Sequence, residues 1–319
     1  MKTIYITSLM VLLIFMLTLP LAAKADIKKD TALGDTQQVI SPVEKEPKDE
    51  KVRVKLSSSG EVVTFSCEDY IFGVVAAEMP ALYEEEALKA QAVTAYTYYL
   101  RKAGDDNDEY DITDDFSIDQ AFITPEKAKE KWGNEANKYE KKIRKAVNAV
   151  LYESVTYKGE PASTVYHAIS SGKTEKASDI WGGDYPYLVS VDSSFDKLAT
   201  NYLSTAEFTS EELKKALSGL VTIEDTGKNC FSDIKRTEAG SVKTVTVSGK
   251  SLGGGDVRKA LGLRSADFDI SFSNGKYTFT VRGYGHGIGM SQNGANYLAM
   301  QGKTYKEILL HYYPGCEIK

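Results

Sequence analysis

The sequence has few of the residues that bind metals or form disulfide frameworks, with three cysteines and three histidines among 319 residues. They are Cys67, Cys230, Cys316, His167, His286 and His311. An odd number of widely spaced cysteines predicts no disulfide framework, although one pair could form in an oxidising compartment. Neither C-x-x-C nor H-x-x-x-H spacing occurs, and zinc usually takes three or four such ligands. We therefore expect no cofactor and no metal, with a site distributed along the chain as the open alternative.

An excess of positive charge is also lacking, since the formal net charge is −6 at pH 7. Nucleic-acid binding depends on attraction to phosphate, so we expect no nucleic-acid partner. The glycine-rich stretch GYGHGIGM (residues 283–290) has Ile288 where a dinucleotide fingerprint starting at Gly283 requires glycine, and it lacks the lysine of a phosphate loop. No G-x-S-x-G motif and no recognisable Cys–His signature occurs, which argues against a nucleophilic serine or cysteine.

A long hydrophobic run, IYITSLMVLLIFMLTLPLAA (residues 4–23), stands at the N-terminus behind Lys2. Ala23-Lys24-Ala25 follows as a small-x-small cleavage site, so residues 1–25 are predicted to be a secretory signal peptide. An uncleaved membrane anchor formed by residues 4–23 is the alternative. In both cases we expect the remainder of the chain to be extracytoplasmic and to contact the membrane only through this segment.

The rest of the chain divides into a tether and a domain. Residues 26–50 are polar, rich in charge and without an apolar period, which is typical of a flexible linker. Residues 51–319 are numerous enough to bury a sizeable core, and we expect them to form a single large domain.

Alternation and helical periodicity together predict an α+β fold of mixed strands and several helices. The expected strands are a hairpin of Val52–Leu56 and Glu61–Ser66 around Ser59-Gly60, then Pro161–Ser170, Val242–Val247 and Lys276–Arg282. The expected helices are Asp69–Glu78, Glu84–Lys102, Pro125 to about Val150, about 203–220, a helix after GYGHGIGM, and Tyr305–Tyr313.

Glu78 is the candidate catalytic residue. It lies in VVAAEMP (residues 74–80), where apolar neighbours should favour the neutral carboxyl and raise its pKa. Pro80 forbids continuation of the helix, which leaves Glu78 at a fixed edge beside the strongest predicted helix of the chain.

The same stretch opens a series of blocks that resembles the stage II sporulation protein D (SpoIID/LytB) family. The blocks are AAEMP, EALKAQAVTAYTYYL, YHAISSGKTEKASDIWGGDYPYLVSV, DVRKALGLRSADFDI and GYGHGIGMSQNGANYLAMQGKTYKEILLHYYPG, in the family's order. They span about residues 51–315. The resemblance implies a single SpoIID-type domain, with a groove lined by glycine-rich loops.

Active members of this family are lytic transglycosylases of bacterial peptidoglycan, and the glutamate of their EMP motif is the catalytic acid. The resemblance therefore implies that Glu78 cleaves the bond between N-acetylmuramic acid and N-acetylglucosamine, in wall remodelling during engulfment in sporulation. Glycoside hydrolases ordinarily use two carboxylates. A lytic transglycosylase needs one, because the 6-hydroxyl of the muramyl ring is an intramolecular nucleophile with a high effective concentration.

Further positions are implied by the same motifs as groups that bind or orient the glycan through hydroxyls, amides and an imidazole. They are Gly285, His286, Gly287, Ser291, Gln292, Ser170, Ser171, Gly172, Thr174, Glu175, Tyr187 and Tyr96. Glu175 has a second reading as a carboxylate that assists the transition state. The implied partners are glycan strands and a wall amidase or endopeptidase acting in concert.

Departures from the family pattern favour a rival function. Tyr96 stands where relatives commonly have arginine, Val189 replaces a basic residue, and Ser171 replaces a glycine. Two lost cations would weaken the grip on a muramyl carboxylate. The alternative is a wall-binding modifier that stimulates a separate amidase without cutting glycan.

Overall fold

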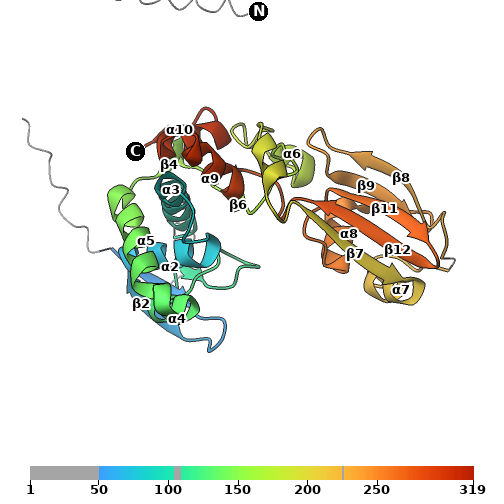
Figure 1. The fold of residues 1–319 in the computed structure, drawn as a ribbon, viewed down its shortest axis with the longest axis horizontal. Coiled ribbons are helices and arrows are strands. Elements are labelled where there is room, and N and C mark those ends of the chain that lie inside the picture. Colours follow the sequence, from blue (N-terminus) through green and yellow to red (C-terminus); the bar gives the residue numbers. More distant parts are fainter. Residues whose placement is uncertain (1–49, 104–108, 225) are drawn as a thin grey trace, which may run out of the picture. The chain divides into compact units, whose positions relative to one another are not determined.

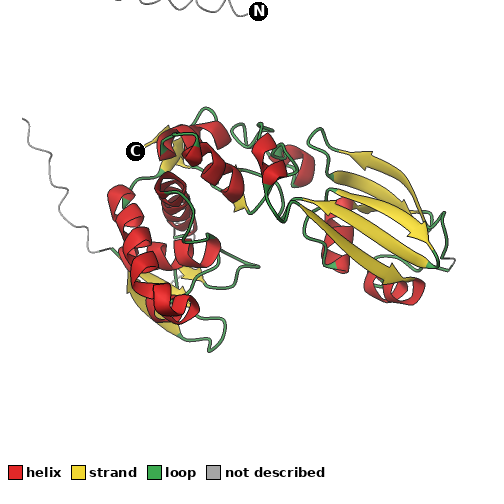
Figure 2. Ribbon diagram, in the orientation of Figure 1, coloured by secondary structure: helices red, strands yellow, loops and turns green. Residues whose placement is uncertain are grey.

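The computed structural model describes residues 50–103, 109–224 and 226–319, which belong to one compact unit of the chain. Helices and strands are mixed along this unit, which confirms the α+β class (Figures 1 and 2). The predicted leader, residues 1–25, and all but the last residue of the predicted tether lie outside the described residues. Among the helices that the structure describes, none combines the length and the apolar character needed to cross a membrane.

The first hydrophobic core gathers around the predicted hairpin and the strongest predicted helix. Strand β1 (Lys51–Lys55) pairs antiparallel with β2 (Val62–Ser66) and parallel with the short β3 (Ile112–Thr113). Helix α3 (Glu85–Lys102) buries most of its side chains in this core. Both the hairpin and this helix agree with the sequence prediction to within about a residue at each end.

Helix α2 (Cys67–Glu78) begins and ends for reasons visible in the sequence. The Ser66 hydroxyl accepts a hydrogen bond from the Asp69 N–H, which caps the first turn. Met79 has left the helical conformation and Pro80 follows, so Glu78 is the last helical residue. The helix is buried almost all round, so its end is held firmly in the core.

The long helix predicted from Pro125 is interrupted. It consists of α4 (Pro125–Trp132), the 3-10 turn η1 (Gly133–Glu135) and α5 (Ala136–Val150). Gly133 adopts a φ of 52°, a conformation that favours glycine and breaks the helical hydrogen bonding.

Short strands from distant parts of the sequence complete the first core. Strand β6 (Tyr166–His167) pairs parallel with β13 (Met290–Ser291). Only these two residues of the predicted strand Pro161–Ser170 are paired along β6, with Pro161 in the separate strand β5 (Glu160–Pro161). The other elements of this part are β4 (Val155–Tyr157), α6 (Ala177–Ile180), η2 (Ser194–Leu198), α9 (Gln292–Met300), α10 (Tyr305–Tyr312) and β14 (Glu317–Ile318).

A second hydrophobic core lies between residues 203 and 282. One sheet has the order β11-β12-β7, from Phe268–Ser273, Lys276–Arg282 and Leu203–Thr209. The other has the order β10-β9-β8, from Lys250–Gly253, Val242–Val247 and Phe231–Arg236. Helices α7 (Ser210–Leu217) and α8 (Gly254–Leu261) accompany them (Figures 1 and 2).

The predicted helix at about 203–220 is wrong in its first half. Leu203–Thr209 is strand β7, which pairs along its length with β12. Burial alternates residue by residue along β7, as expected for a strand with one covered face. Helix α7 begins only after Thr209, which forms a capping box with Glu212.

Candidate active site

Glu78 faces a pocket of about 740 Å³. Its wall is assembled from segments far apart in the sequence: the end of α2, a residue of α3, the loop before α4, the β6 region, the residue after α6, the glycine-rich loop and the start of α9. The lining residues are Ala77, Glu78, Tyr98, Phe116, Ser117, Ile118, Asp119, Gln120, Ala121, Val165, Tyr166, His167, Ala168, Trp181, Tyr284, Gly285, His286 and Gln292.

The Glu78 carboxyl is held by hydrogen bonds and partly removed from water. Its Oε1 accepts a hydrogen bond of 2.9 Å from the Ala121 backbone N–H. Burial raises the pKa of Glu78 above its ordinary value, and the Ala121 N–H together with the polar groups of Tyr166 and Gln292 offsets part of this effect. The hydrogen bond from Ala121 therefore fixes the position of the carboxyl, and the raised pKa favours its protonated form.

Asp119 is the other acid in the lining of this pocket, and its carboxylate is already occupied. Its Oδ1 lies 3.3 Å from Lys102 Nζ and accepts a hydrogen bond from the Tyr98 hydroxyl. Its Oδ2 accepts the Thr113 backbone N–H at 3.0 Å. The Asp119 side chain is 3% exposed, so it supports the loop rather than offering a free base to the pocket.

Two histidines line the pocket as neutral rings, and the Ile288 backbone holds both. His167 Nδ1 lies 3.1 Å from the Ile288 carbonyl oxygen, whereas His286 Nδ1 accepts the Ile288 N–H at 3.1 Å. Burial lowers the pKa of His167 to about 4 and that of His286 to about 3. The charge of Arg258 contributes to both shifts, after burial. Both imidazoles are therefore uncharged at neutral pH.

Exposed rings stand at the edge of the same pocket. Phe116 is 80% exposed, Trp181 49% and Tyr284 47%. The Trp181 ring lies 5.1 Å from that of His286 between centroids, and the Arg264 guanidinium lies 4.3 Å above the Tyr284 ring. Large apolar rings beside a pocket of polar groups suit a ligand with both flat faces and hydroxyls, as a sugar has.

Three of the binding residues predicted from the sequence line the Glu78 pocket: Gly285, His286 and Gln292. Gly285 has a φ of 115°, and a Cβ there would come within 2.6 Å of the His167 Cβ. Glycine is thus required for the loop to approach β6. Gln292 Nε2 donates to Gln91 Oε1 of α3 at 3.3 Å, which fixes the first residue of α9.

The predicted loop Ser170–Thr174 is absent from the lining of this pocket, and its polar groups bind other parts of the protein. The Ser170 N–H donates to Asp196 Oδ2, and Ser171 Oγ donates to the Ala239 carbonyl. Thr174 Oγ1 donates to the Val189 carbonyl and accepts the Val191 N–H. Gly172 has a φ of 112° beside the Lys197 side chain. Glycan binding by these residues stays a prediction.

Glu175 also lies outside the lining of the Glu78 pocket. Its Oε1 accepts hydrogen bonds from Thr237 Oγ1 at 3.0 Å and from the Ser241 N–H at 3.2 Å. Burial raises the pKa of Glu175, and Oε2 has no partner among the described residues. A Cβ at Gly287 would come within 2.9 Å of the Glu175 Cγ. Glu175 therefore joins the glycine-rich loop to the turn before β9.

The remaining predicted residues are buried in structural contacts. The Tyr96 hydroxyl donates to Glu50 Oε2 at 3.1 Å, and the Tyr187 hydroxyl accepts the Ser163 N–H at 2.7 Å. Ser291 caps α9 by accepting the Gly294 N–H. Tyr96 and Val189, two of the three predicted departures from the family pattern, are both absent from the lining of the Glu78 pocket.

Sequence reasoning did not single out several residues of the pocket. Gln120 Oε1 accepts a hydrogen bond from the Tyr166 hydroxyl at 3.2 Å, and Gln120 Nε2 donates to the Tyr70 hydroxyl at 2.7 Å. Tyr166, His167 and Trp181 all belong to the block YHAISSGKTEKASDIWGGDYPYLVSV. Their position within a family block was therefore the sequence signal that could have identified them as pocket residues. Gln120 lies in an irregular acidic segment in which no sequence motif marks it as a pocket residue.

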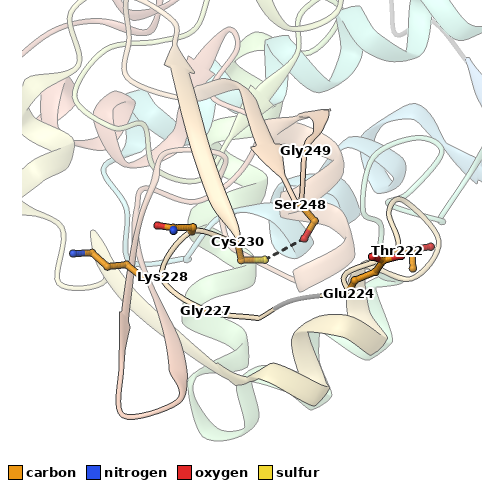
Figure 3. A pocket seen from close by; sticks show the side chains of 8 residues that line it. Thr222, Glu224, Gly227, Lys228, Cys230, Ser248 and Gly249 are labelled. Atoms are coloured by element: carbon orange, nitrogen blue, oxygen red, sulfur yellow. Dashed lines mark hydrogen bonds between the residues drawn. The ribbon is translucent and has the colours of Figure 1, made fainter.

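Figure 3 shows a different pocket, of about 700 Å³, at the edge of the second core. Cys230 Sγ lies 3.7 Å from Ser248 Oγ there, and the loop that carries Gly227 and Lys228 forms a rim. None of the residues predicted from the sequence as catalytic or binding lines it. Its acid, Glu224, belongs to an exposed loop.

Cysteine and metal chemistry have no assembled site within the described residues. Cys67, Cys230 and Cys316 are all free and buried, so the open alternative of one disulfide pair is not realised. No group of three or more His, Cys, Asp or Glu side chains in residues 50–103, 109–224 and 226–319 is arranged to hold a metal ion.

Known proteins resemble this chain over most of its length. Residues 56–157 match the family model of the stage II sporulation protein, SpoIID. The stage II sporulation protein D of Bacillus amyloliquefaciens is 38% identical over 271 residues, which cover 84% of this chain and 78% of the relative. The protein of the same name from Bacillus subtilis is 36% identical with the same coverage. An amidase enhancer of Bacillus subtilis is 28% identical over 76% of this chain and 39% of its own length. This chain belongs to the stage II sporulation protein D family.

Proposed function

We propose that this protein is a lytic transglycosylase of peptidoglycan and that Glu78 is its only acid and base. It cleaves the bond between N-acetylmuramic acid and N-acetylglucosamine and leaves 1,6-anhydro-muramyl ends. The observation that carries the proposal is a partly buried carboxyl with a raised pKa and no cationic partner among the described residues, in a pocket edged by exposed rings.

The single free acid favours this reaction over hydrolysis by a pair of carboxylates. A hydrolase needs a second carboxylate to attack the sugar or activate water. Asp119, the other acid in the described pocket lining, is paired with Lys102 and bound by Thr113 and Tyr98. A substrate that supplies its own nucleophile removes the need for a second base.

In the first step protonated Glu78 donates its proton to the glycosidic oxygen. The bond from the muramyl C1 to that oxygen breaks, and N-acetylglucosamine leaves with a hydroxyl. In the second step the muramyl 6-hydroxyl attacks C1, and the Glu78 carboxylate takes its proton. One proton is given and one is recovered, so Glu78 ends as it began. A raised pKa suits the first step, because the acid must still carry its proton near working pH.

The walls of the pocket supply binding without charge. Trp181 and Tyr284 offer faces on which sugar rings stack, while His286 and Gln292 offer hydrogen bonds to hydroxyls and acetamido groups. Since both histidines are neutral at pH 7, they do not compete with Glu78 as acids.

The names of the relatives supply the biological setting for the proposal. We place the reaction outside the cytoplasm, in wall remodelling during sporulation, with a hydrophobic leader that delivers the domain to the wall. A wall amidase or endopeptidase acting in concert is the proposed partner.

A second candidate function rests on the likeness to the amidase enhancer, 28% identical over 76% of this chain. In this reading the domain binds glycan and stimulates a separate amidase, and Glu78 cuts nothing. The pocket is compatible with binding alone, so only product analysis separates the two candidates.

The deciding experiment incubates the purified protein with glycan strands, with and without stem peptides, and identifies products by mass spectrometry. Wild type should generate anhydro-muramyl ends, and Glu78→Gln should lower their rate by about 10²–10⁴-fold, the usual contribution of an acid–base group. Glu84→Gln is the matched control, an exposed acid outside the pocket. Binding without cleavage by wild type would favour the enhancer, and cleavage at the wild-type rate by Glu78→Gln would remove Glu78 from the mechanism.

A further inference from the structure

A second cavity, of about 270 Å³, adjoins the Glu78 pocket. Trp181 and His286 belong to the lining of both, so the two cavities share a wall. The other lining residues come from α6, the start of β9, the end of β10, α8 and the segment before β11, and they include Asp179, Lys243, Gly255, Asp256 and Arg258. A polymer that lies across Glu78 and contacts Trp181 and His286 would therefore border the second cavity as well.

Arg258 is the cation of this cavity that lacks a carboxylate partner. Its Nε donates to the Leu263 carbonyl oxygen at 3.3 Å. Among the described residues no carboxylate lies within ion-pair distance of its guanidinium, and the other guanidinium N–H groups find no acceptor. Burial lowers the pKa of Arg258, which shows the unfavourable desolvation of a cation that no anion compensates.

The remaining charges of the cavity are compensated or exposed. Lys243 Nζ lies 2.9 Å from Asp179 Oδ1, so these two residues neutralise each other. Asp256 is an exposed acid in the first turn of α8. Gly253, Gly254 and Gly255 also line the cavity, and a Cβ built on Gly255 would meet nothing within 4 Å, so the backbone there borders open space.

We propose that this cavity is a carboxylate-binding subsite of the glycan site, centred on Arg258. The proposal rests on the proposed function, because it identifies which part of a wall glycan the second cavity takes. Arginine presents a planar array of N–H donors that matches a carboxylate, and such charge-assisted hydrogen bonds strengthen where water is partly excluded.

Two parts of peptidoglycan carry the carboxylate in question. A muramyl unit without a stem peptide exposes its own lactyl carboxylate, whereas in a peptide-bearing unit that group is an amide and the stem peptide carries the carboxylates. Chitin oligosaccharides have the same backbone sugar geometry and no carboxylate. These three ligands separate recognition of the anion from recognition of the sugar.

The test measures equilibrium binding of the three ligands to full-length protein that carries Glu78→Gln, so that no ligand is consumed. Adding Arg258→Gln should weaken binding of bare or peptide-bearing strands by about tenfold and change chitin binding by less than about twofold. Lys259→Gln, which removes an exposed cation at the next position of α8, is the control and should leave all three affinities unchanged. Asp256→Asn should strengthen carboxylate binding, because it removes a neighbouring negative charge.

The outcomes are distinct. A loss confined to bare strands identifies the lactyl carboxylate, and a loss confined to peptide-bearing strands identifies the stem peptide; both support the subsite. Equal losses for chitin, or no loss for any ligand, overturn it. Cleavage by the protein with Glu78 intact is measured separately, so a missing anhydro product contradicts the proposed reaction while the binding assay still decides on Arg258.

Discussion

At the scale of single residues, the environment of Glu78 raises its pKa by burial, while neighbouring polar groups partly stabilise the ionised carboxylate. Burial acts against the charged form, while the Ala121 N–H, Tyr166 and Gln292 act for it. Tyr166 itself is kept protonated, because burial and the nearby Glu78 charge raise its pKa well above the ordinary tyrosine value. The balance among these groups is open to measurement.

Glu78→Gln should make the fold more stable at neutral and alkaline pH. Because the folded-state pKa of Glu78 is raised, its contribution to stability is fully present below the unfolded pKa and is lost as pH rises through the folded pKa. The variant should therefore melt above wild type at pH 7–8 and together with it near pH 4. About 1 kcal/mol moves the Tm of a domain of about 150–250 residues by about 2–4 °C, so calorimetry at several pH values resolves the effect. A Tm gap that widens toward low pH would contradict the assignment.

Tyr166→Phe should shift the alkaline limb of the rate–pH profile to higher pH. The Tyr166 hydroxyl stabilises the Glu78 carboxylate, so its removal raises the pKa of Glu78 further and keeps the acid protonated longer. Tyr284→Phe is the comparison, since Tyr284 lines the same pocket and its hydroxyl is not among the groups that shift Glu78. Equal shifts in both variants would mean that the hydroxyl of Tyr166 has no specific part.

At the scale of elements, the pocket depends on how closely α2 packs against the segment before α4. Gly73 lies one turn and a half before Glu78, and a Cβ there would come within 2.4 Å of the Ile123 carbonyl oxygen and the Phe122 ring. The same segment carries Ala121, whose N–H holds Glu78. Close packing at Gly73 thus fixes the distance between the acid and its hydrogen-bond donor.

Gly73→Ala should destabilise the protein by about 1–3 kcal/mol, the usual effect of overpacking a core. It should also lower activity more than the loss of folded protein explains, because Ala121 moves away from Glu78. Gly219→Ala is the control, since its Cβ meets nothing within 4 Å. Denaturant unfolding and the specific activity of the folded fraction check both statements. A variant with the activity and the unfolding free energy of wild type would show that the packing at Gly73 is not tight.

The elements that sequence predicts best are those with strong local signals. Helix α3 was predicted to within a residue because acids open it, basic residues close it and apolar residues recur at helical spacing. Strand β7 falls within the predicted helix, although Thr209 and Glu212 form a capping box that marks the start of α7. Its strand character comes from pairing with β12, some seventy residues later in the chain.

In the pocket, too, residues marked by their neighbours in sequence could be predicted, whereas residues placed by distant parts of the chain could not. Glu78 was predicted from its apolar neighbours and Pro80, which are local features. Gln120 was not predicted, because its place depends on hydrogen bonds to Tyr70 and Tyr166, 50 and 46 residues away. The catalytic role of Glu78 and the binding roles of the other predicted residues stay predictions.

At the scale of the whole molecule, two hydrophobic cores form within one compact unit, and buried polar contacts connect them. Glu175, beside the glycine-rich loop, accepts hydrogen bonds from Thr237 and Ser241, which precede β9. Arg236 in turn donates to the carboxylates of Asp267 and Asp269, which holds the turn against β11. Glu175 therefore contributes both to the stability of the fold and to the position of the glycine-rich loop.

Glu175→Ala should lower the free energy of unfolding by about 1–3 kcal/mol, because it leaves the Thr237 hydroxyl and the Ser241 N–H without their acceptor. Glu175→Gln keeps an acceptor oxygen and should lose much less. Chemical denaturation measures both values. If Glu175 instead assists the reaction, Glu175→Gln will fold as wild type and lose most of its activity, so activity at matched stability separates the two roles.

Glu78 ends α2, and the direction in which that helix runs has a chemical consequence. The last carbonyl groups of a helix point out of its C-terminal end and give it a partial negative charge. The last turn of α2 contains no basic side chain of its own, and Lys131 of α4 donates to one of its carbonyl groups, that of Ala76, at 3.2 Å. Lys131 compensates one of these carbonyl groups, so the remaining field at the helix end, which disfavours a carboxylate, depends on a cation that the chain supplies from a neighbouring helix.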